Sequence, residues 1–561
     1  MISRREATGR NLLTIFFSVF LAKSPLICPA IVTRHDFVSC LYCRVHSCKD
    51  GAIMNMDSRQ NYSKIVALLL LVFVAGESVL HAADWRFEVK FDKTIHSDDF
   101  TGRVYVIFSR TKREPRTGPG WFNPEMFVSR DVEKLKPGEP VLFTGAAPGD
   151  MLAYPGPLAK FELKGFRAQA VVRFNPYERK IGTGAGNGYS QVISIKAQQA
   201  EATPLFFTVD KLVTPRKFAN TKFSKLLRVR SKLLSEFHGR GVFLKAAVSL
   251  PASYYDEPDR RYPSIWNIPG FGGTHLSGRR NGPVREENEQ GVEFLRLMLD
   301  PSCPLGHHVF ADSANNGPVG AALVSEFIPA FDRKFRSIAA PTARFLTGHS
   351  SGGWSSLWLQ VTYSEHFGGT WSTSPDPVDF RDFQRINLYS PGENMYLDNK
   401  GNKRPLARRG DQVTLWYKGF ADMEWTLGPG GQLHSFEAAF SPRGKDGKPL
   451  LVWDRKTGEV HTEVAKTWEK YDIRLILERN WKTLGPKLTG KLHVIMGDGD
   501  TFYLEGATKL LKKSLADLNS DAIVELVPGK DHFNLFRGGL AMRIRREMVS
   551  QFLQHHPPRN E

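Results

Sequence analysis

The residues best suited to chemistry lie in a few short loops, and the sharpest motif spans residues 348–352, Gly-His-Ser-Ser-Gly. An apolar run precedes this motif and a helix-like segment follows it. A serine in a tight strand-to-helix turn has a strained backbone, and flanking glycines avoid side-chain clashes so that its Oγ projects above the sheet. We therefore predict that Ser350 is a nucleophile and that the backbone N–H of Ser351 faces an oxyanion.

A serine nucleophile at its ordinary pKa needs a general base. The chain has 16 histidines, and position singles out His532, which follows the apolar run 522–527 in the loop Pro-Gly-Lys-Asp-His-Phe. Loops at the carboxyl ends of strands are where open α/β sheets assemble their sites. We therefore predict that His532 is the base.

A carboxylate is also required, because the base must be held in one tautomer and its imidazolium stabilised. The loop 497–501, Gly-Asp-Gly-Asp-Thr, offers Asp498 and Asp500. Asp500 is favoured because Gly499 lets the loop turn and the residues after it lead into a helix. Asp376, at the end of another expected strand, is the third candidate. With Asp500, the chain order Ser, Asp, His matches that of α/β-hydrolases.

A second oxyanion donor is expected in the loop 269–273, Pro-Gly-Phe-Gly-Gly, which follows the apolar run 264–268. Its glycines leave the backbone N–H groups accessible at the position where such a fold needs a donor. The N–H of Phe271 is the first candidate and that of Gly272 the alternative.

The elements that must position these loops occupy residues 226–552, where apolar strands alternate with longer helix-like segments. Such alternation predicts an α/β class fold with a mostly parallel sheet covered on both faces. Charged, Gly- and Pro-rich sequence interrupts it at about 376–486. This insertion is too long for a plain loop and is predicted to be a lid over the Ser350 pocket. The expected strands are 243–250, 264–268, 308–311, 343–347, 368–373, 491–496 and 522–527, and the expected helices are 321–335, 353–362 and 505–518.

The insertion contains five large aromatic residues, Trp416, Phe420, Trp425, Phe436 and Phe440. They are expected either to form a small core of the insertion or to face the substrate. A layer of this kind over the site would expel water and narrow the acyl pocket.

Residues 84–214 have another rhythm, with short runs of alternating apolar and polar residues punctuated by Gly and Pro. Period-2 strands separated by turns predict a small antiparallel β-sandwich ahead of the catalytic region. The Gly-rich stretch 182–188 lacks the lysine and the helix of a phosphate loop and is interpreted as a hairpin loop.

Residues 226–552 resemble the α/β-hydrolase group that includes esterase D, enterochelin esterases, feruloyl esterases and mycolyl acyltransferases. The resemblance implies an α/β-hydrolase domain and a serine esterase, and several members of the group also have an N-terminal β-sandwich. The insertion at 376–486 is longer than in the simple members, which leaves the substrate open. The matching segments are Ala246–Pro251, Tyr262-Pro263, Gly270–Gly273, Ser325–Pro329, the motif at 348–352, Gly497–Asp500 and His532.

The first 82 residues read as a leader. The better of two signal-like segments follows Met54 and Met56 with basic residues, an apolar run at 65–75 and small residues at 82–83. This pattern is typical of a cleaved secretory signal, so translation is expected to begin at Met54 or Met56 and the product to be secreted or periplasmic. The Cys40, Cys43, His46, Cys48 cluster lies in this leader and is not expected to hold a metal.

The formal net charge of the 561 residues is +18. This balance favours contact with an anionic surface, but no basic run interleaved with aromatics indicates nucleic-acid binding, and we interpret the charge mainly as a solvated surface. The leading hypothesis is hydrolysis of a small-molecule or carbohydrate-linked ester through Ser350, Asp500 and His532, without a metal or an organic cofactor. The alternatives are an acyltransferase of the same fold and a carbohydrate- or surface-binding protein that acts through the β-sandwich. The oligomeric state is left open.

Overall fold

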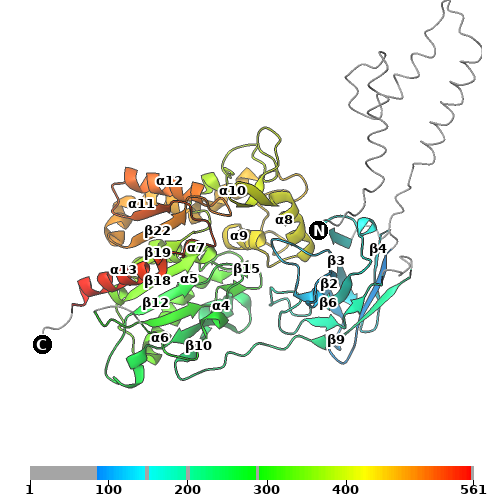
Figure 1. The fold of residues 1–561 in the computed structure, drawn as a ribbon, viewed down its shortest axis with the longest axis horizontal. Helices are drawn as coiled ribbons and strands as arrows, with labels where there is room; N and C mark the ends of the chain where they lie inside the picture. The colour runs from blue at the N-terminus through cyan, green and yellow to red at the C-terminus, as the bar shows by residue number, and fades with distance from the viewer. Residues whose placement is uncertain (1–84, 146–150, 197–202, 286–289, 558–561) are drawn as a thin grey trace, which may run out of the picture. The chain divides into compact units, whose positions relative to one another are not determined.

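The two sequence patterns, short alternating strands before residue 214 and alternating strands and helices after residue 226, correspond to two separate large β-sheets in the computed structural model (Figure 1). The structure describes residues 85–145, 151–196, 203–285 and 290–557. These residues belong to one compact unit, Ala82–Glu561. The leader, with its two possible start residues and its cysteine cluster, lies outside the described residues. Within the described part of the chain, no helix combines the length and the apolar character needed to span a bilayer.

The first sheet contains nine strands in the order β4-β1-β9-β7-β6-β2-β3-β5, with β8 paired to β6. Hydrogen bonds join all nine into one continuous sheet, and β1 pairs with β9 in parallel, so the expected two-sheet antiparallel sandwich is not confirmed. The strands are β1 Arg86–Phe91, β2 Phe100–Ser109, β3 Phe127–Leu135, β4 Val141–Thr144, β5 Met151–Tyr154, β6 Arg167–Val172, β7 Gly188–Ser190, β8 Ile193–Ser194 and β9 Leu205–Leu212.

Strand β2 is buried on both of its faces, which explains why its apolar residues are almost continuous. Val104, Val106 and Phe108 join the core of the first sheet. Tyr105 and Ile107 point the other way, as alternate residues of a strand must, and join the large core that contains the second sheet. The first sheet therefore packs directly against the rest of the described chain.

The second sheet has the order β10-β11-β13-β12-β18-β19-β22-β23. Strands β10 and β11 are antiparallel to their neighbours and the remaining strands are parallel, as expected for a mostly parallel α/β sheet. The strands are β10 Ser224–Ser231, β11 Val242–Ser249, β12 Ser264–Ile268, β13 Leu295–Leu299, β18 Arg344–His349, β19 Gly369–Thr373, β22 Leu492–Gly497 and β23 Ile523–Val527.

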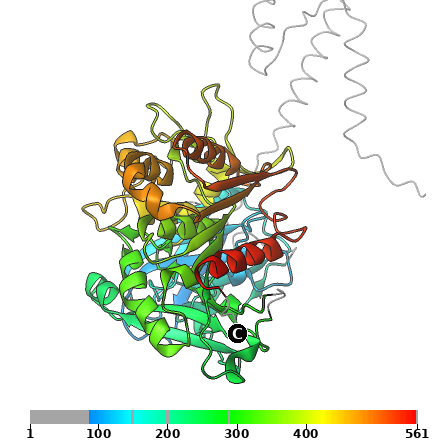
Figure 2. The same cartoon turned by 90° about the vertical axis from the view of Figure 1, so that its left-hand side faces the viewer.

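Helices cover both faces of this sheet. Helix α13 lies across one face, where Ile544, Met548 and Phe552 join Phe345 and Trp371 of the strands in one apolar cluster (Figure 2). On the other face α7 packs against β18 and β19. The helices are α4 Lys232–His238, α5 Val319–Ala322, α6 Ile328–Lys334, α7 Ser351–Thr362, α8 Tyr417–Leu427, α9 Gln432–Phe440, α10 Thr462–Thr467, α11 Ile473–Leu488, α12 Glu505–Asp517 and α13 Leu540–His555.

Two expected elements are wrong. Residues 308–311 form no strand, because Val309 and Phe310 have positive φ values of 46° and 54°. The strand in this part of the sheet is β13, whose sequence Leu-Arg-Leu-Met-Leu has the alternation of a strand but was not predicted. The single helix expected over 321–335 is divided into α5, a π-helical turn at Leu323–Phe327 and α6. Pro329 lacks the N–H that would continue an α-helical ladder through this point.

The insertion between β19 and β22 is part of the main core. Leu406, Phe420, Phe436 and Phe440 belong to the same apolar cluster as the strands of the second sheet. The insertion contains α8 to α11 and a hairpin of β20 Pro405–Arg409 and β21 Gln412–Trp416. It is therefore an integral layer of the fold. Two further short strand pairs are β14 Ser302–Cys303 with β15 Gly306–His307, and β16 Asp312–Ser313 with β17 Gly317–Pro318.

A buried ionic cluster fixes the ends of the insertion to each other. Asp379 and Asp472 are completely buried, and Arg474 is 4% exposed. The Arg474 Nε lies 3.1 Å from Asp379 Oδ2. Asp472 accepts hydrogen bonds from Phe380 N at 2.9 Å and, as the N-cap of α11, from Leu475 N at 3.0 Å. These contacts join the segment that leaves β19 to the helix that returns to β22.

The substitution Arg474→Leu should therefore lower the free energy of unfolding by about 3 kcal/mol, because it leaves buried carboxylates without one of their cations. Urea unfolding at neutral pH measures this change. The matched control is Arg479→Leu on the same helix, which removes an ion pair with Glu469 whose side chains are 56% and 35% exposed. The control should lose less than about 1 kcal/mol. Equal effects of the two substitutions would contradict the role given to the buried cluster.

Candidate active site

Ser350 lies between β18 and α7 with a strained backbone. Its φ of 61° and ψ of −127° fall outside the regions that non-glycine residues prefer, a strain that typically costs about 1–3 kcal/mol. The turn is held by three hydrogen bonds: Ser350 N donates to Thr373 O, and Ser350 O accepts from Trp354 N and Asp376 N. A side chain at Gly352 would bring a Cβ within 1.9 Å of Ile268 O, so the first turn of α7 requires glycine there. The expected strand-turn-helix is present.

His532 and Asp500 form a buried pair beside this turn. His532 Nδ1 lies 2.8 Å from Asp500 Oδ2, and the two residues are 4% and 0% exposed. Asp500 Oδ1 accepts a further hydrogen bond from Phe502 N at 2.8 Å, which fixes the carboxylate. Both residues lie in loops that follow adjacent parallel strands, β22 and β23, at their carboxyl ends. The geometry therefore brings together the base and the acid that the sequence favoured.

The two other candidate carboxylates do not contact His532. Asp498 is exposed, and its Oδ1 accepts a hydrogen bond from Gly529 N. This bond joins the loop 497–501, called the acid loop below, to the loop 528–533, called the histidine loop. Asp376 is 5% exposed and bonds to Ser351 and Gln432. Of the three candidate carboxylates, all of which are described, only Asp500 forms a hydrogen bond with His532.

Ser350 and His532 are neighbours without a direct bond. The ring centroids of His349 and His532 are 4.5 Å apart, so the residue that precedes Ser350 packs on His532. No hydrogen bond between the Ser350 hydroxyl and His532 is present in the described part of the chain. Catalytic hydrogen bonds of this kind are often long without substrate and tighten when it binds. Burial lowers the pKa of His349 to about 3, so this imidazole adds no positive charge next to His532 at neutral pH.

The loop that contains two of the predicted oxyanion donors lies against Ser350. A Cβ built on Gly270 would lie 3.2 Å from Ser350 Cβ and 3.8 Å from Ser350 Oγ, so the loop 269–273 passes directly over the serine. Within the described residues, no hydrogen bond to a backbone carbonyl uses the N–H groups of Phe271, Gly272 or Ser351. All three donors are therefore available to a bound group near Ser350.

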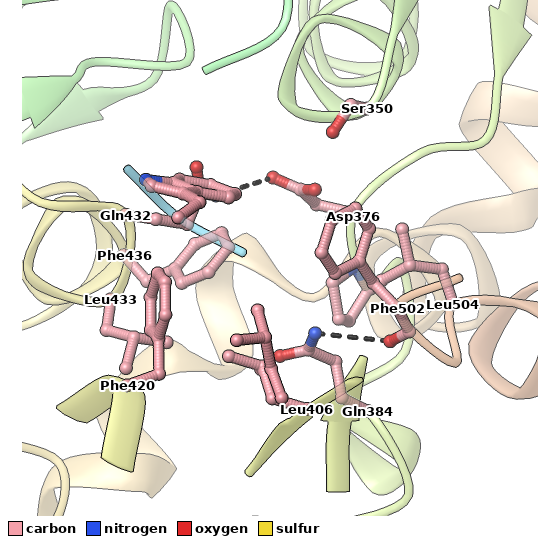
Figure 3. A pocket seen from close by; sticks show the side chains of 13 residues that line it. Ser350, Asp376, Gln384, Leu406, Phe420, Gln432, Leu433, Phe436, Phe502 and Leu504 are labelled. Atoms are coloured by element: carbon pink, nitrogen blue, oxygen red, sulfur yellow. Dashed lines mark hydrogen bonds between the residues drawn. The ribbon is translucent and has the colours of Figure 1, made fainter. Parts of the chain in front are cut away.

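A largely apolar pocket extends from Ser350 (Figure 3). Ser350 and Asp376 lie at one end, and Leu406 and Gln384 lie at the far end. The insertion supplies much of the wall through Phe420, Phe436 and others, as expected from its position in the chain. The lining residues are Trp121, Ser350, Asp376, Pro377, Gln384, Leu406, Leu415, Phe420, Gln432, Leu433, Phe436, Phe502 and Leu504.

The five aromatic residues of the insertion divide between three environments. Phe420 and Phe436 line the pocket. Phe440 is buried in the core, where its ring contacts that of Trp354 at a centroid distance of 5.0 Å. Trp416 and Trp425 are 45% and 42% exposed, and they neither line the pocket nor belong to the core.

Asp376 is a polar group at the serine end of this pocket. Ser351 Oγ donates to Asp376 Oδ2 at 2.5 Å, and Gln432 Nε2 lies 3.4 Å from the same oxygen. The Ser351 hydroxyl is therefore engaged and the residue is 1% exposed, which makes it unsuitable as a nucleophile. Burial raises the pKa of Asp376 from 3.8 to about 6. Its carboxyl group is thus protonated in part near neutral pH.

The pocket also contains residues that sequence reasoning missed. Trp121 comes from the segment between β2 and β3, more than 200 residues from Ser350 in the chain, and Gln432 begins α9. Neither residue lies in a motif, so no local signal was available to identify it. The one free cysteine of the described residues, Cys303, is unsuited to nucleophilic chemistry because burial raises its pKa to about 12.

No group of three or more His, Cys, Asp or Glu side chains in the described ranges is arranged to hold a metal ion. The pocket side of Ser350 is lined by apolar groups and uncharged amides apart from Asp376. The polar groups of the described site include a serine, an imidazole with its carboxylate, and backbone N–H groups.

No protein-family model and no curated protein matches the chain. Among solved structures, a ferulic acid esterase shares 12% identity with it over 59% of this chain and 100% of that chain, with a TM-score of 0.36. An S-formylglutathione hydrolase from Agrobacterium tumefaciens shares 14% over 59% and 98%, with a TM-score of 0.37. The dipeptidyl peptidase 4 of Porphyromonas gingivalis shares 11% over 76% and 48%, with a TM-score of 0.33.

At these identities and scores, the matches assign no activity to this chain.

The raised pKa of Asp376 predicts a pH-dependent difference in stability between the wild type and Asp376→Asn. A carboxyl group whose pKa is higher in the folded state binds its proton more tightly there. Its stabilising contribution to the free energy of unfolding is therefore present below pH 4 and is lost as the pH rises through about 6. Relative to Asp376→Asn, the wild type should lose on the order of 3 kcal/mol of unfolding free energy between pH 4 and pH 8. Urea unfolding of both proteins across this range measures it. If the unfolding free energies of the wild type and Asp376→Asn changed in parallel with pH, Asp376 would not have the raised pKa.

Proposed function

We propose that the chain is a serine hydrolase that cleaves carboxylic esters through an acyl-enzyme. Ser350 Oγ attacks the ester carbonyl carbon while His532 Nε2 takes its proton. His532 then gives this proton to the leaving alcohol oxygen, and water, activated by the same imidazole, releases the acid and frees Ser350. Asp500 holds the tautomer in which Nδ1 carries the proton and stabilises the imidazolium.

The observation that carries this proposal is the 2.8 Å contact between His532 and Asp500 next to a serine with a strained backbone at the end of an apolar pocket. A buried His–Asp pair, a strained serine or an apolar pocket can each occur alone in a protein without hydrolase activity. Together they supply a nucleophile, a base, an orienting acid and a place for an acyl group, which are the parts that acyl transfer to a serine requires.

The developing oxyanion needs hydrogen-bond donors that are in place before the reaction. In the proposed mechanism, Ser351 N–H and a donor from the loop 269–273, either Phe271 N–H or Gly272 N–H, fill this role. The proposal is supported by the close approach of Gly270 to Ser350 Oγ. Loss of one such donor typically costs about 2.7–4 kcal/mol of transition-state stabilisation.

The pocket supports an apolar acyl group of limited size. Phe420, Leu433 and Phe436 form one side of it and Phe502 and Leu504 the other (Figure 3). Gln384, at the far end, is already engaged: its Oε1 accepts from Tyr417 OH at 2.7 Å and its Nε2 donates to Phe502 O at 3.1 Å. A polar or charged acyl terminus would therefore find at most one remaining N–H and one lone pair of this amide there, in exchange for its hydration.

The assignment predicts a graded series of defects in hydrolysis of p-nitrophenyl esters. Ser350→Ala should remove turnover, with a loss of at least about 10⁴-fold in kcat. Asp500→Asn should lower kcat by about 10⁴-fold, because the base then adopts the wrong tautomer. Asp498→Asn, which changes an exposed carboxylate of the same loop, and Asp376→Asn should each stay within about tenfold of the wild type. Steady-state kinetics with folding checked by circular dichroism measure the series.

Full turnover by Ser350→Ala would refute the proposed nucleophile. If Asp376→Asn were the crippling change and Asp500→Asn were mild, the orienting acid would come from the loop after β19 and the mechanism would need that correction.

A further inference from the structure

The side chain of Phe271, in the loop that passes over Ser350, is in contact with two side chains from the first sheet region. The indole of Trp121 stacks on its ring, with centroids 5.4 Å apart and planes inclined by 27°. The guanidinium carbon of Arg179 lies 4.5 Å from the centroid of the same ring. Trp121 belongs to the connection between β2 and β3, and Arg179 to that between β6 and β7. Neither is part of the catalytic sheet or its loops.

The loop 269–273 needs such external support. Gly270, Gly272 and Gly273 give its backbone wide freedom, and Gly272 has a φ of 90°. The hydrogen bond from Gly273 N to Gly270 O is a single internal restraint, and His307 Nε2 holds Pro269 O at 3.0 Å. Phe271 is the one residue of the loop after Pro269 that has a side chain. Fixing its ring therefore fixes the two N–H groups on either side of the Phe271 Cα.

Arg179, which packs on the Phe271 ring, is partly desolvated. It is half-buried, and within the described residues it forms no ion pair with a carboxylate. Burial lowers the pKa of its guanidinium. Its guanidinium lies over the Phe271 ring, and its Nη1 lies 3.5 Å from Gly430 O. A partly desolvated cation over an aromatic face is stabilised by the ring quadrupole, and the same contact restricts the ring.

Trp121 reaches three parts of the site at once. Besides stacking on Phe271, it contacts the Phe420 ring of the insertion edge-on at 5.2 Å and the Phe502 ring of the acid loop edge-on at 6.3 Å. Phe502 in turn contacts the His532 ring edge-on at 4.9 Å. Trp121 is also a wall of the pocket. One side chain from the first sheet region therefore contacts the loop 269–273, the insertion and the acid loop.

We propose that Trp121 and Arg179 are positioning residues that hold the loop 269–273 so that its N–H groups face the oxyanion. The first sheet region then acts as a component of the catalytic machinery, in contrast to a separate carbohydrate-binding module. This inference rests on the proposed ester hydrolysis at Ser350. It predicts that the two residues affect the transition state more than the binding of a small ester.

The test uses the full chain with Arg179→Met and Trp121→Leu, and with the conservative variants Arg179→Lys and Trp121→Phe. The substrate is p-nitrophenyl acetate, whose acyl group is too small to need the Trp121 wall. Rates are expressed per Ser350 site labelled to completion by a fluorophosphonate, so that misfolded protein does not count. The control is Arg110→Met, which removes a guanidinium 4.5 Å from the ring of Phe166 in the same sheet region but away from the site.

Arg179→Met and Trp121→Leu should lower kcat by about 10- to 100-fold and change KM by less than about threefold, since a displaced donor is lost mainly in the transition state. The Ki of an aliphatic trifluoromethyl ketone, which Ser350 converts to a hemiketal oxyanion, should rise by the same factor as kcat/KM falls. Arg179→Lys and Trp121→Phe should restore part of kcat and part of the affinity for the trifluoromethyl ketone. Arg110→Met should match the wild type in both measurements.

Unchanged kcat/KM and Ki in Arg179→Met and Trp121→Leu, with Ser350-dependent turnover intact, would overturn the positioning role and leave the proposed function standing. A rise in KM with constant kcat and Ki would also overturn it, because it would reduce both residues to substrate contacts. Ester turnover that persists in Ser350→Ala would instead refute the proposed function.

Discussion

The site depends on the left-handed backbone of Ser350, which is possible only because three segments hold the turn from different sides. Thr373 of β19 accepts the Ser350 N–H, α7 begins on the Ser350 carbonyl, and β12 approaches Gly352 too closely for any side chain. The hydroxyl is thereby raised over the carboxyl ends of the parallel strands. The loops that contain His532 and Asp500 follow β23 and β22, so the order of strands places all three residues at the same edge of the sheet.

Around this turn, the fold has enclosed the pocket with segments that are distant in sequence. The insertion supplies most of one wall, and it also supports the acid loop: Arg408 N and Nε donate to Thr501 O and Asp500 O, and its Nη2 pairs with Glu505. The first sheet in turn satisfies the last carbonyls of α8, because Arg103, Ser129 and Tyr105 donate to residues 425–427. A helix end that is buried without such donors would be unstable. The insertion and the first sheet are thus mutually dependent layers.

The sequence predicted the parts of the site that have a local signature. Ser350, His532 and Asp500 each lie in a short loop directly after an apolar strand, and the order of strands and loops suffices to bring them to one edge. The second sheet was predicted for the same reason. The errors have two sources: the short alternating run Leu295–Leu299 was overlooked, and residues 308–311 are apolar but turn sharply.

Contacts across long separations could not be predicted at all. Trp121 and Arg179 meet Phe271 from loops with no distinguishing composition, and the continuous pairing of the first sheet depends on β1 meeting β9, more than 100 residues later. Such contacts are selected by packing in three dimensions, which a linear pattern does not record.

The central claim is that Ser350 is the activated nucleophile, and the most direct measurement is covalent labelling of the folded protein with a fluorophosphonate, followed by peptide mass mapping. The account predicts one adduct per chain, on Ser350, which is absent from Ser350→Ala and is greatly slowed in Asp500→Asn. An adduct on Ser351 or on any other residue, or equal labelling of Ser350→Ala, would contradict it.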